Sequence, residues 1–432
     1  MAQMPQASVD ERSLDAVPNA PDRHKPVGFI LRLAKALHTY GVPAYELETT
    51  LSACARQLGY GLQCLSLPTS ITMSLMRKKD HVQTFVIRVA PGEVHLEKLR
   101  RVSDVAHRVM KGELSTADGA DELQQINKAR PAYPMWVVVI AFAMVSASVA
   151  RLFGGGLNEM IGATSAGLAL GLLTIVSARV SLLAHLLPAT AALLSTLVAY
   201  ATAHFLPGTE VYISVVSGLI ILLPGLTLTI AMAELATQNL MSGTARLFGA
   251  GTVFILMAFG MVIGNHIADV FSLKDVAMNH KVIPLPDWTE WTAVLMGSVA
   301  LFILFQARFR DAIWVIAGGF VAFAATKYSG IYFNNAMTAF LGAIAVGSCA
   351  NLVSRFTEVP GATLVVPGFI ILVPGSVGFK SLTALVEHDV VRGLDTAFNM
   401  TLVGISLVAG LLISSLVTLP KASAVQELDT EL

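Results

Sequence analysis

The pattern of apolar and polar positions changes character once along the chain, near residue 133. Before it, short amphipathic stretches at helical spacing, such as FILRLAKALHTYG (29–41), alternate with strand-like runs such as VQTFVIRVA (82–90). After it, long and almost uncharged apolar segments follow one another. The order helix, helix, strands, helix, helix predicts a small α+β domain over 28–133, ahead of a mainly α, polytopic membrane region.

Local signals place the ends of these first elements. Gly41 suits a left-handed helix end, Pro43 suits a first helical turn, and Ser115 suits an N-cap. The run LQCLSLPTSITMSLM (62–76) is interpreted as one strand that kinks at LPTS. Residues 1–27 are polar and contain proline without the apolar core of a signal peptide, which predicts a disordered tail.

About 20 apolar residues are needed to cross a bilayer. Ten segments qualify: 134–153, 157–177, 182–206, 211–233, 245–268, 288–306, 311–327, 332–353, 359–380 and 394–418. The longest connection follows the fifth segment. It divides the region into a first set (134–270), a connecting loop (271–287), a second set (288–420) and a C-terminal tail (421–432).

The two sets contain a repeated motif, GLIILLPG at 218–225 and GFIILVPG at 368–375. At a constant offset of 150, Gly218 matches Gly368 and Pro224-Gly225 matches Pro374-Gly375. Because five spans per copy is an odd number, the second copy is expected to be inverted relative to the first.

Pro-Gly pairs inside apolar helices are costly, since proline removes a hydrogen-bond donor and glycine favours the unfolded chain. Inverted repeats with such interrupted helices are typical of secondary transporters, whose cargo binds where the helices break. The alternative interpretation is that each pair only kinks a packed helix. The predicted cargo pathway comprises Gly218, Pro224, Gly225, Thr227, Thr229, Gly368, Pro374, Gly375 and Ser376.

Ionisable residues close to the interrupted segments are candidates for proton coupling, because charges within a membrane are expensive. These candidates are Glu234, Glu387, His388 and Asp389. The alternative is that they lie at span ends and are simply solvated.

Composition supports this division. The first 133 residues hold 17 of the 29 Lys/Arg and 14 of the 29 Asp/Glu, while the chain as a whole is 54% hydrophobic. The small positive balance of the front domain does not favour nucleic-acid binding.

Cys54, Cys64 and Cys349 lack metal spacing, and the first two are expected to be reduced and buried. Lysines and arginines divide almost evenly between the loops on the two sides of the membrane, so the loop charges do not decide the orientation. The charged front domain lacks an export signal and is expected to stay in the cytoplasm. An even number of spans then places the C-terminus in the cytoplasm as well.

The segments HTYGVPAYELETTLSACARQLG, LPTSITMSL and ARPAYP, together with the two Pro-Gly spans, resemble the threonine/serine exporter (ThrE) family from about residue 28 to 418. The resemblance implies export of threonine, serine or similar small metabolites from the cytoplasm, driven by the proton motive force. We therefore expect a proton-coupled antiporter in the plasma (inner) membrane that has no cofactor or metal, and we leave a homo-oligomer open. The positions that match the family's recurrent motif are His38, Tyr40, Gly41, Pro43, Glu46, Pro68, Thr69 and Ser70.

Two other functions remain open at this point. Some relatives are associated with dicarboxylate export, so succinate is an alternative cargo. The front domain could instead make the chain a membrane-anchored enzyme or ligand sensor, although its His38, Glu46 and Ser70 lack a nucleophile elbow or phosphate-binding loop. We therefore expect a transporter rather than an enzyme.

Overall fold

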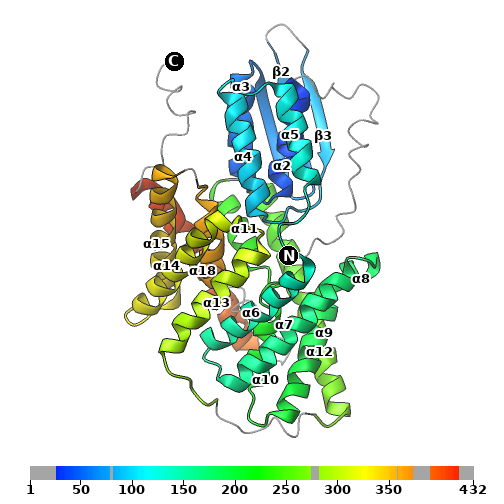
Figure 1. Cartoon of the computed structure of the whole chain (residues 1–432), viewed down its shortest axis with the longest axis vertical. Coiled ribbons are helices and arrows are strands. Elements are labelled where there is room, and N and C mark those ends of the chain that lie inside the picture. The colour runs from blue at the N-terminus through cyan, green and yellow to red at the C-terminus, as the bar shows by residue number, and fades with distance from the viewer. Residues whose placement is uncertain (1–25, 78–80, 274–281, 358, 373–389, 418–432) are drawn as a thin grey trace. The chain divides into compact units, whose positions relative to one another are not determined.

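The computed structural model describes the whole chain apart from residues 1–25, 78–80, 274–281, 358, 373–389 and 418–432 (Figure 1). The described residues form two compact units. The N-terminal unit comprises residues 26–132 together with Ile230–Arg246, and the membrane unit comprises Tyr133–Thr229 and the described residues from Leu247 onward. The division falls inside two helices, so the soluble domain predicted over 28–133 packs with an additional stretch of chain.

The N-terminal unit has the predicted order of elements. Helices α2 (Pro26–Thr39) and α3 (Ala44–Gln57) precede strands β1 (Gly61–Leu67), β2 (Ser70–Met76) and β3 (Gln83–Arg88), and helices α4 (Leu96–Met110) and α5 (Thr116–Lys128) follow. The strands form one antiparallel sheet in the order β1-β2-β3. Helices α2 and α3 contact this sheet, and α4 and α5 pack against α2 around a core that includes Phe29, Leu51 and Ile126.

The LPTS segment differs from the prediction. Leu67 pairs directly with Ser70, so Pro68 and Thr69 form a two-residue turn between two antiparallel strands. The interpretation of a single kinked strand was wrong because proline at a turn was taken for proline within a strand. The helix ends were predicted correctly: Gly41 has φ +83°, and the Ser115 side chain accepts a hydrogen bond from the Asp118 amide at 3.1 Å.

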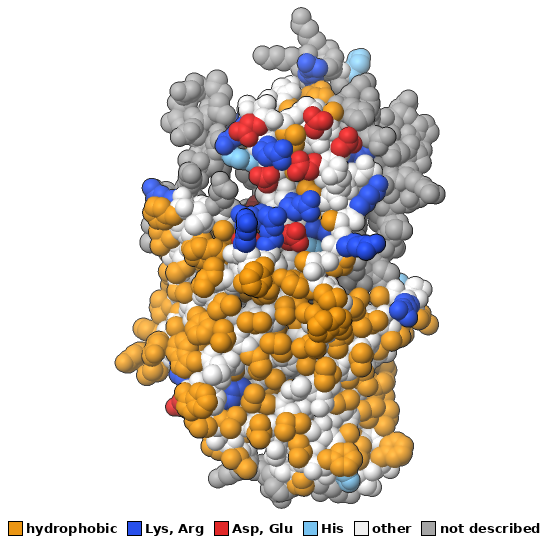
Figure 2. Space-filling model, in the orientation of Figure 1, with side chains coloured by type: hydrophobic (Ala, Val, Ile, Leu, Met, Phe, Trp, Pro, Cys, Tyr) orange, Lys and Arg blue, Asp and Glu red, His pale blue; other side chains and the backbone are white. Residues whose placement is uncertain are grey.

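Every regular element in the described part of the membrane unit is a helix. Its elements are α6 (Met135–Leu152), α7 (Leu157–Ser177), α8 (Ser181–His185), α9 (Leu187–Phe205), α10 (Val211–Leu219), α11 (Gly225–Ala236), α12 (Leu240–Val270), α13 (Trp288–Leu304), η1 (Phe309–Asp311), α14 (Ala312–Ser329), α15 (Asn335–Phe356), α16 (Ala362–Leu372) and α18 (Val390–Val417). Helices α11 and α12 begin or end in the N-terminal unit. Hydrophobic side chains cover the surface of the membrane helices on the face shown in Figure 2, whereas Lys, Arg, Asp and Glu gather on the N-terminal unit.

Six helical segments are long and apolar enough to cross a membrane: Met135–Leu152, Leu157–Ser177, Leu240–Val270, Phe309–Ser329, Asn335–Phe356 and Gly393–Leu416. Helices α11 and α13 are apolar but shorter. The predicted third span is divided into α8 and α9, the fourth is interrupted, and only the first part of the ninth lies within the described residues. Ten crossings therefore remain a prediction.

The two predicted sets of helices have matching neighbours. Helix α7 packs against α6, α9 and α10, and α14 packs against α13, α15 and α16. The similarity extends to single residues: a Cβ on Gly218 of α10 would meet Ala166 of α7 and Ser195 of α9, and one on Gly368 of α16 would meet Gly318 of α14 and Val346 of α15. The motif glycines thus permit the same close helix contacts in both sets.

The first helices of the two sets, α6 and α13, run antiparallel to each other. Tyr133, before α6, donates a hydrogen bond to the carbonyl of Ala307, after α13, at 2.9 Å. Near their other ends, Ser148 donates to the Ala293 carbonyl at 2.6 Å and Arg151 to Thr289 at 2.6 Å. A pair of corresponding helices therefore points in opposite directions.

Candidate functional site

The first Pro-Gly pair interrupts its helix. Helix α10 ends at Leu219, and α11 begins only at Gly225. Within the break, the Leu222 amide donates to the Leu219 carbonyl at 2.8 Å, and the Gly225 amide donates to the Leu223 carbonyl at 2.8 Å. In the second set, α16 ends at Leu372, and Pro374, Gly375 and Ser376 lie outside the described residues.

This geometry removes helical donors from two carbonyls. In a continuous helix, the Ile220 carbonyl would accept from residue 224, but that residue is proline and has no N–H. The carbonyl of the next residue, Ile221, would accept from Gly225, whose amide turns to Leu223 instead. The proline effect recurs in the second motif, because Pro374 is four residues after Ile370. In each motif the proline therefore leaves the carbonyl of one isoleucine, Ile220 or Ile370, without its helical partner.

These two isoleucines line one cavity within the membrane unit. The cavity has a volume of about 200 Å³. Its wall comes from α6, α13, α14 and the ends of the two motif helices, and consists of Val145, Ser148, Val149, Leu152, Phe153, Ile220, Gly297, Leu301, Phe323, Thr326 and Ile370. Residues separated by 150 positions in the sequence thus face a common space that is mostly apolar, with two hydroxyl groups.

None of the other predicted pathway residues in the described part of the chain lines the cavity. Gly218 and Gly368 serve helix packing, as described above. Thr229 is buried and its hydroxyl donates to the Gly225 carbonyl at 3.2 Å, which stabilises the start of α11. Thr227 is half-buried. Ile220 and Ile370 were not singled out from the sequence, although their position four residues before each proline would have identified them.

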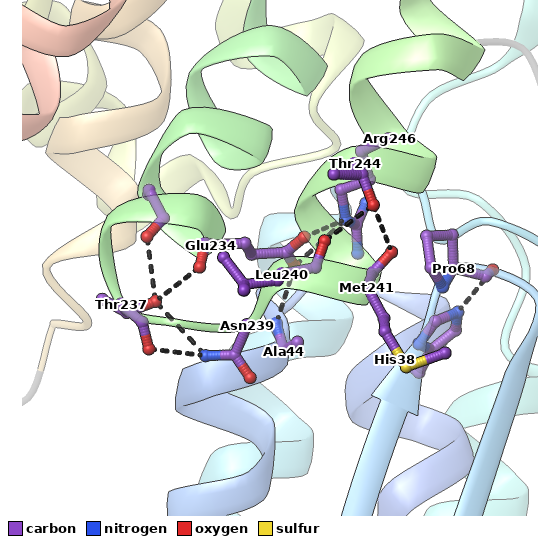
Figure 3. A network of polar contacts seen from close by, with 11 residues as sticks. His38, Ala44, Pro68, Glu234, Thr237, Asn239, Leu240, Met241, Thr244 and Arg246 are labelled. Carbon is purple, nitrogen blue, oxygen red and sulfur yellow. Dashed lines mark hydrogen bonds and ion pairs between the residues drawn. The ribbon is translucent and has the colours of Figure 1, made fainter.

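Glu234, the first proton-coupling candidate, is completely buried in the N-terminal unit (Figure 3). Both of its carboxylate oxygens accept hydrogen bonds from the Arg246 Nε at 3.1 Å, and Oε1 also accepts from the Ala44 amide at 3.0 Å. The pair joins α11 to α12 and connects both to the first turn of α3. Glu387, His388 and Asp389 lie outside the described residues.

The family-motif residues of the N-terminal unit have structural contacts. His38 is buried, and its Nε2 donates to the Pro68 carbonyl at 3.2 Å, so α2 is fixed to the β1–β2 turn (Figure 3). Burial and the nearby positive charge of Arg246 lower the pKa of His38, which keeps the ring neutral.

The remaining motif residues support the same region. The Tyr40 hydroxyl donates to the Asn127 side chain at 3.2 Å, and Pro43 precedes α3 as its N-cap residue. Gly41 allows the left-handed turn between the helices, whereas Glu46 is exposed. Within the described part of this unit, His38 hydrogen-bonds a backbone carbonyl rather than Thr69 or Ser70.

The described residues show neither a metal-binding cluster nor a reactive thiol. No group of three His, Cys, Asp or Glu side chains in that part of the chain could hold a metal ion. Cys54 and Cys64 are free thiols, as expected; Cys54 is buried and Cys64 is half-buried. Burial raises the pKa of each to about 12, so neither is a reactive thiolate.

A charged cluster at the ends of three membrane helices was not predicted. Glu290 of α13 contacts both Lys327 of α14 and Arg151 of α6. From the sequence, Arg151 and Lys327 were only counted among the loop charges that test orientation, and neither was proposed as a site residue. The available signal was that both fall within the last turns of apolar segments, not beyond them.

These observations define the chain as a polytopic helical membrane protein with an α+β unit at its N-terminal end and a cavity between its two sets of helices. The chain belongs to the threonine/serine exporter family. A family described as "Putative threonine/serine exporter" matches residues 28–268, and a second, "Threonine/Serine exporter, ThrE", matches residues 290–417.

Curated relatives include fungal membrane proteins. The chain is 26% identical to "Pheromone-regulated membrane protein 10" of Zygosaccharomyces rouxii, over 92% of this chain and 43% of the relative. It is 27% identical to the protein of the same name from Eremothecium gossypii, over 83% of this chain and 49% of the relative. The chain thus spans less than half the length of these relatives. No solved structure shows a significant match.

Proposed function

We propose that the protein is a secondary transporter that exports small polar amino acids, such as threonine and serine, from the cytoplasm in exchange for protons. The observation that carries the proposal is the cavity in which Ile220 and Ile370 meet. Both belong to Pro-Gly motifs at an offset of 150, and interrupted helices at repeat interfaces are typical cargo sites. Membership of the threonine/serine exporter family supports the cargo class.

The chemistry of the cavity suits a small zwitterion. The carbonyls of Ile220 and Ile370, which lack their helical donors, can accept hydrogen bonds from a cargo ammonium group. Ser148 and Thr326 supply hydroxyls for a polar side chain, and in this structure both donate to backbone carbonyls. Bare backbone is tolerated at membrane depth where it lines such a cavity.

The antiparallel α6–α13 pair and the matched neighbours of α7 and α14 support an arrangement of two inverted five-helix repeats, with ten crossings. The cavity is not symmetric, because Phe323 and Thr326 of α14 line it while their counterparts on α7, 150 positions earlier, do not. An off-centre cavity is what one state of an alternating-access cycle would contain.

We further propose that the protein resides in the plasma (inner) membrane with both termini in the cytoplasm. An even number of crossings and the charged N-terminal unit support this orientation. Labelling of single cysteines placed at Leu157, which is 61% exposed at the end of the helices where Arg151 lies, and at Ala132, which is exposed before α6, would test it in intact cells: only the former is expected to react with an impermeant thiol reagent.

The full-length protein in proteoliposomes provides the decisive experiment. Vesicles preloaded with unlabelled threonine are expected to accumulate labelled threonine or serine, and a pH gradient should accelerate this counterflow. Labelled succinate that accumulates in vesicles preloaded with unlabelled succinate, without accumulation of threonine or serine in threonine-loaded vesicles, would make the protein a dicarboxylate exporter. Failure of all three solutes to move would refute export and favour a role confined to the N-terminal unit.

A further inference from the structure

Three charged side chains from three helices meet at one end of the membrane unit. Arg151 lies in the last turn of α6, Glu290 in the first turn of α13 and Lys327 in the last turn of α14. One Glu290 oxygen accepts a hydrogen bond from the Lys327 ammonium, and the other lies 3.7 Å from the Arg151 guanidinium. A single carboxylate is thus shared by two cations, and the cluster carries one excess positive charge.

The two cations are held differently. Arg151 is 5% exposed, donates to Thr289 at 2.6 Å, and also donates to the carbonyls of Leu285 and Pro286 at 3.2 Å each. The Lys327 side chain is 31% exposed, and its contacts in the described structure are Glu290 and the ring of Phe323, 5.6 Å away. Arg151 is therefore a fixed anchor, whereas Lys327 can exchange its carboxylate partner without breaking other hydrogen bonds.

The cluster continues the cavity wall on all three helices. Phe323, Ser148 and Gly297 line the cavity. Lys327 is four residues after Phe323, Arg151 is three after Ser148 and Glu290 is seven before Gly297, and these spacings place residues on the same face of a helix. The ammonium–ring contact between Lys327 and Phe323 joins the cluster to the wall directly.

We propose that Lys327, supported by Arg151, binds the carboxylate group of the cargo, and that Glu290 occupies this position when no cargo is present. The proposal rests on the proposed function, and it makes α-amino acids and other small monocarboxylates the ligand class. Exchanging one carboxylate for another keeps Lys327 paired throughout, which avoids the large cost of an unpaired charge close to lipid.

The assignment predicts opposite effects for two substitutions, measured as serine binding to the full-length protein in detergent by calorimetry. Lys327→Gln should weaken L-serine binding about tenfold or more, because the exchangeable cation is lost, and Lys327→Arg should restore most of it. Glu290→Gln should tighten binding several-fold, because the internal competitor is removed. Serinol, the amino alcohol that lacks the carboxylate, should bind weakly to the native protein and be insensitive to both changes.

A matched control is Arg179→Gln, which removes an exposed charge just after α7, the helix that corresponds to α14. It should leave serine binding unchanged. Weaker serine binding in both Lys327→Gln and Glu290→Gln would indicate that the cluster is purely structural and would overturn the assignment. Native-like serine binding in both variants would overturn it as well. Neither result would contradict the proposed export function. If Lys327→Gln fails to fold, serine binding by Glu290→Gln alone tests the assignment: tighter binding supports it, and unchanged or weaker binding overturns it. A native protein that neither binds nor transports serine would overturn the proposed function itself, and this assignment with it.

Discussion

Ile220 and Ile370, 150 positions apart in the sequence, line the same cavity, and each precedes a proline by four residues. Each proline lacks the amide that would pair with the carbonyl of the isoleucine four residues before it in a continuous helix. The shared cavity therefore supports our proposal that the two Pro-Gly pairs serve one site, and it favours that proposal over two unrelated kinks.

Filling this cavity should stop transport. Ile220→Trp and Ile370→Trp each add a large ring to a space of about 200 Å³, and we expect flux in proteoliposomes to fall about tenfold or more in either variant. Ile255→Trp is the control, because Ile255 is 62% exposed on α12. If both cavity variants transport like the native protein, the cavity is not on the cargo pathway.

Restoring the missing amides should also abolish function. The double variant Pro224→Ala, Pro374→Ala supplies an N–H four residues after each isoleucine, and alanine favours helix by about 3 kcal/mol over proline. We expect normal membrane insertion and loss of counterflow. Pro367→Ala serves as the control, because Pro367 lies inside α16 and its counterpart at position 217 is serine. Unchanged flux in the double variant would show that these prolines are only kinks.

Much of the N-terminal unit was predictable because its signals are local. The φ of Gly41, the Ser115 cap and the order of helices and strands depend on residues within one or two turns of each other. The Pro68-Thr69 turn was missed because the same residues fit a strand kink equally well, and only the partner strand distinguishes the two. The boundary of the unit was not predictable, since Glu234 joins it through Ala44, 190 residues away in sequence.

The membrane site was predicted in part. The repeat located the interruption at Pro224, because two copies of an expensive motif mark a position regardless of tertiary structure. The residues that form the wall could not be found in the same way, since Ser148 and Phe323 become neighbours of Ile220 only through helix packing. The Arg151–Glu290–Lys327 cluster was missed for a related reason: each residue alone looks like an ordinary charge at a helix end.

The Glu234–Arg246 pair should contribute strongly to the stability of the N-terminal unit. Their side chains are 0% and 10% exposed, and removing one partner of a buried pair typically costs about 3–5 kcal/mol. Glu234→Gln should therefore accelerate thiol labelling of Cys54 in a full-length Cys64→Ser, Cys349→Ser background, with partial recovery in the Glu234→Gln, Arg246→Gln double variant. Glu122→Gln, which breaks the half-exposed pair with Arg108, should change labelling little.

The same variant tests whether Glu234 carries the coupling proton. If it does, Glu234→Gln should retain threonine counterflow but lose its acceleration by a pH gradient. Acceleration equal to that of the native protein would restrict Glu234 to its structural role.

The N-terminal unit should lose stability in mild acid through His95. This side chain caps α4 by accepting a hydrogen bond at Nδ1 from the Lys98 amide at 3.3 Å, which requires a neutral ring. Burial, with the adjacent Lys98 charge, lowers the pKa of His95 to about 4 from its ordinary value of 6.5. Between these pH values His95 is protonated in the unfolded chain but neutral in the folded unit. The free energy of unfolding is therefore fully present above about pH 6.5 and falls toward pH 4, by up to about 3 kcal/mol.

Hydrogen exchange of the α4 amides in the full-length protein, corrected for intrinsic rates, should show this loss of stability. It should be reduced in His95→Asn, which keeps a capping side chain, and unchanged in His81→Asn, where the histidine is exposed. Equal pH dependence in the native protein and His95→Asn would assign the acid sensitivity to other groups, with His38, whose pKa is also lowered, as the next to replace.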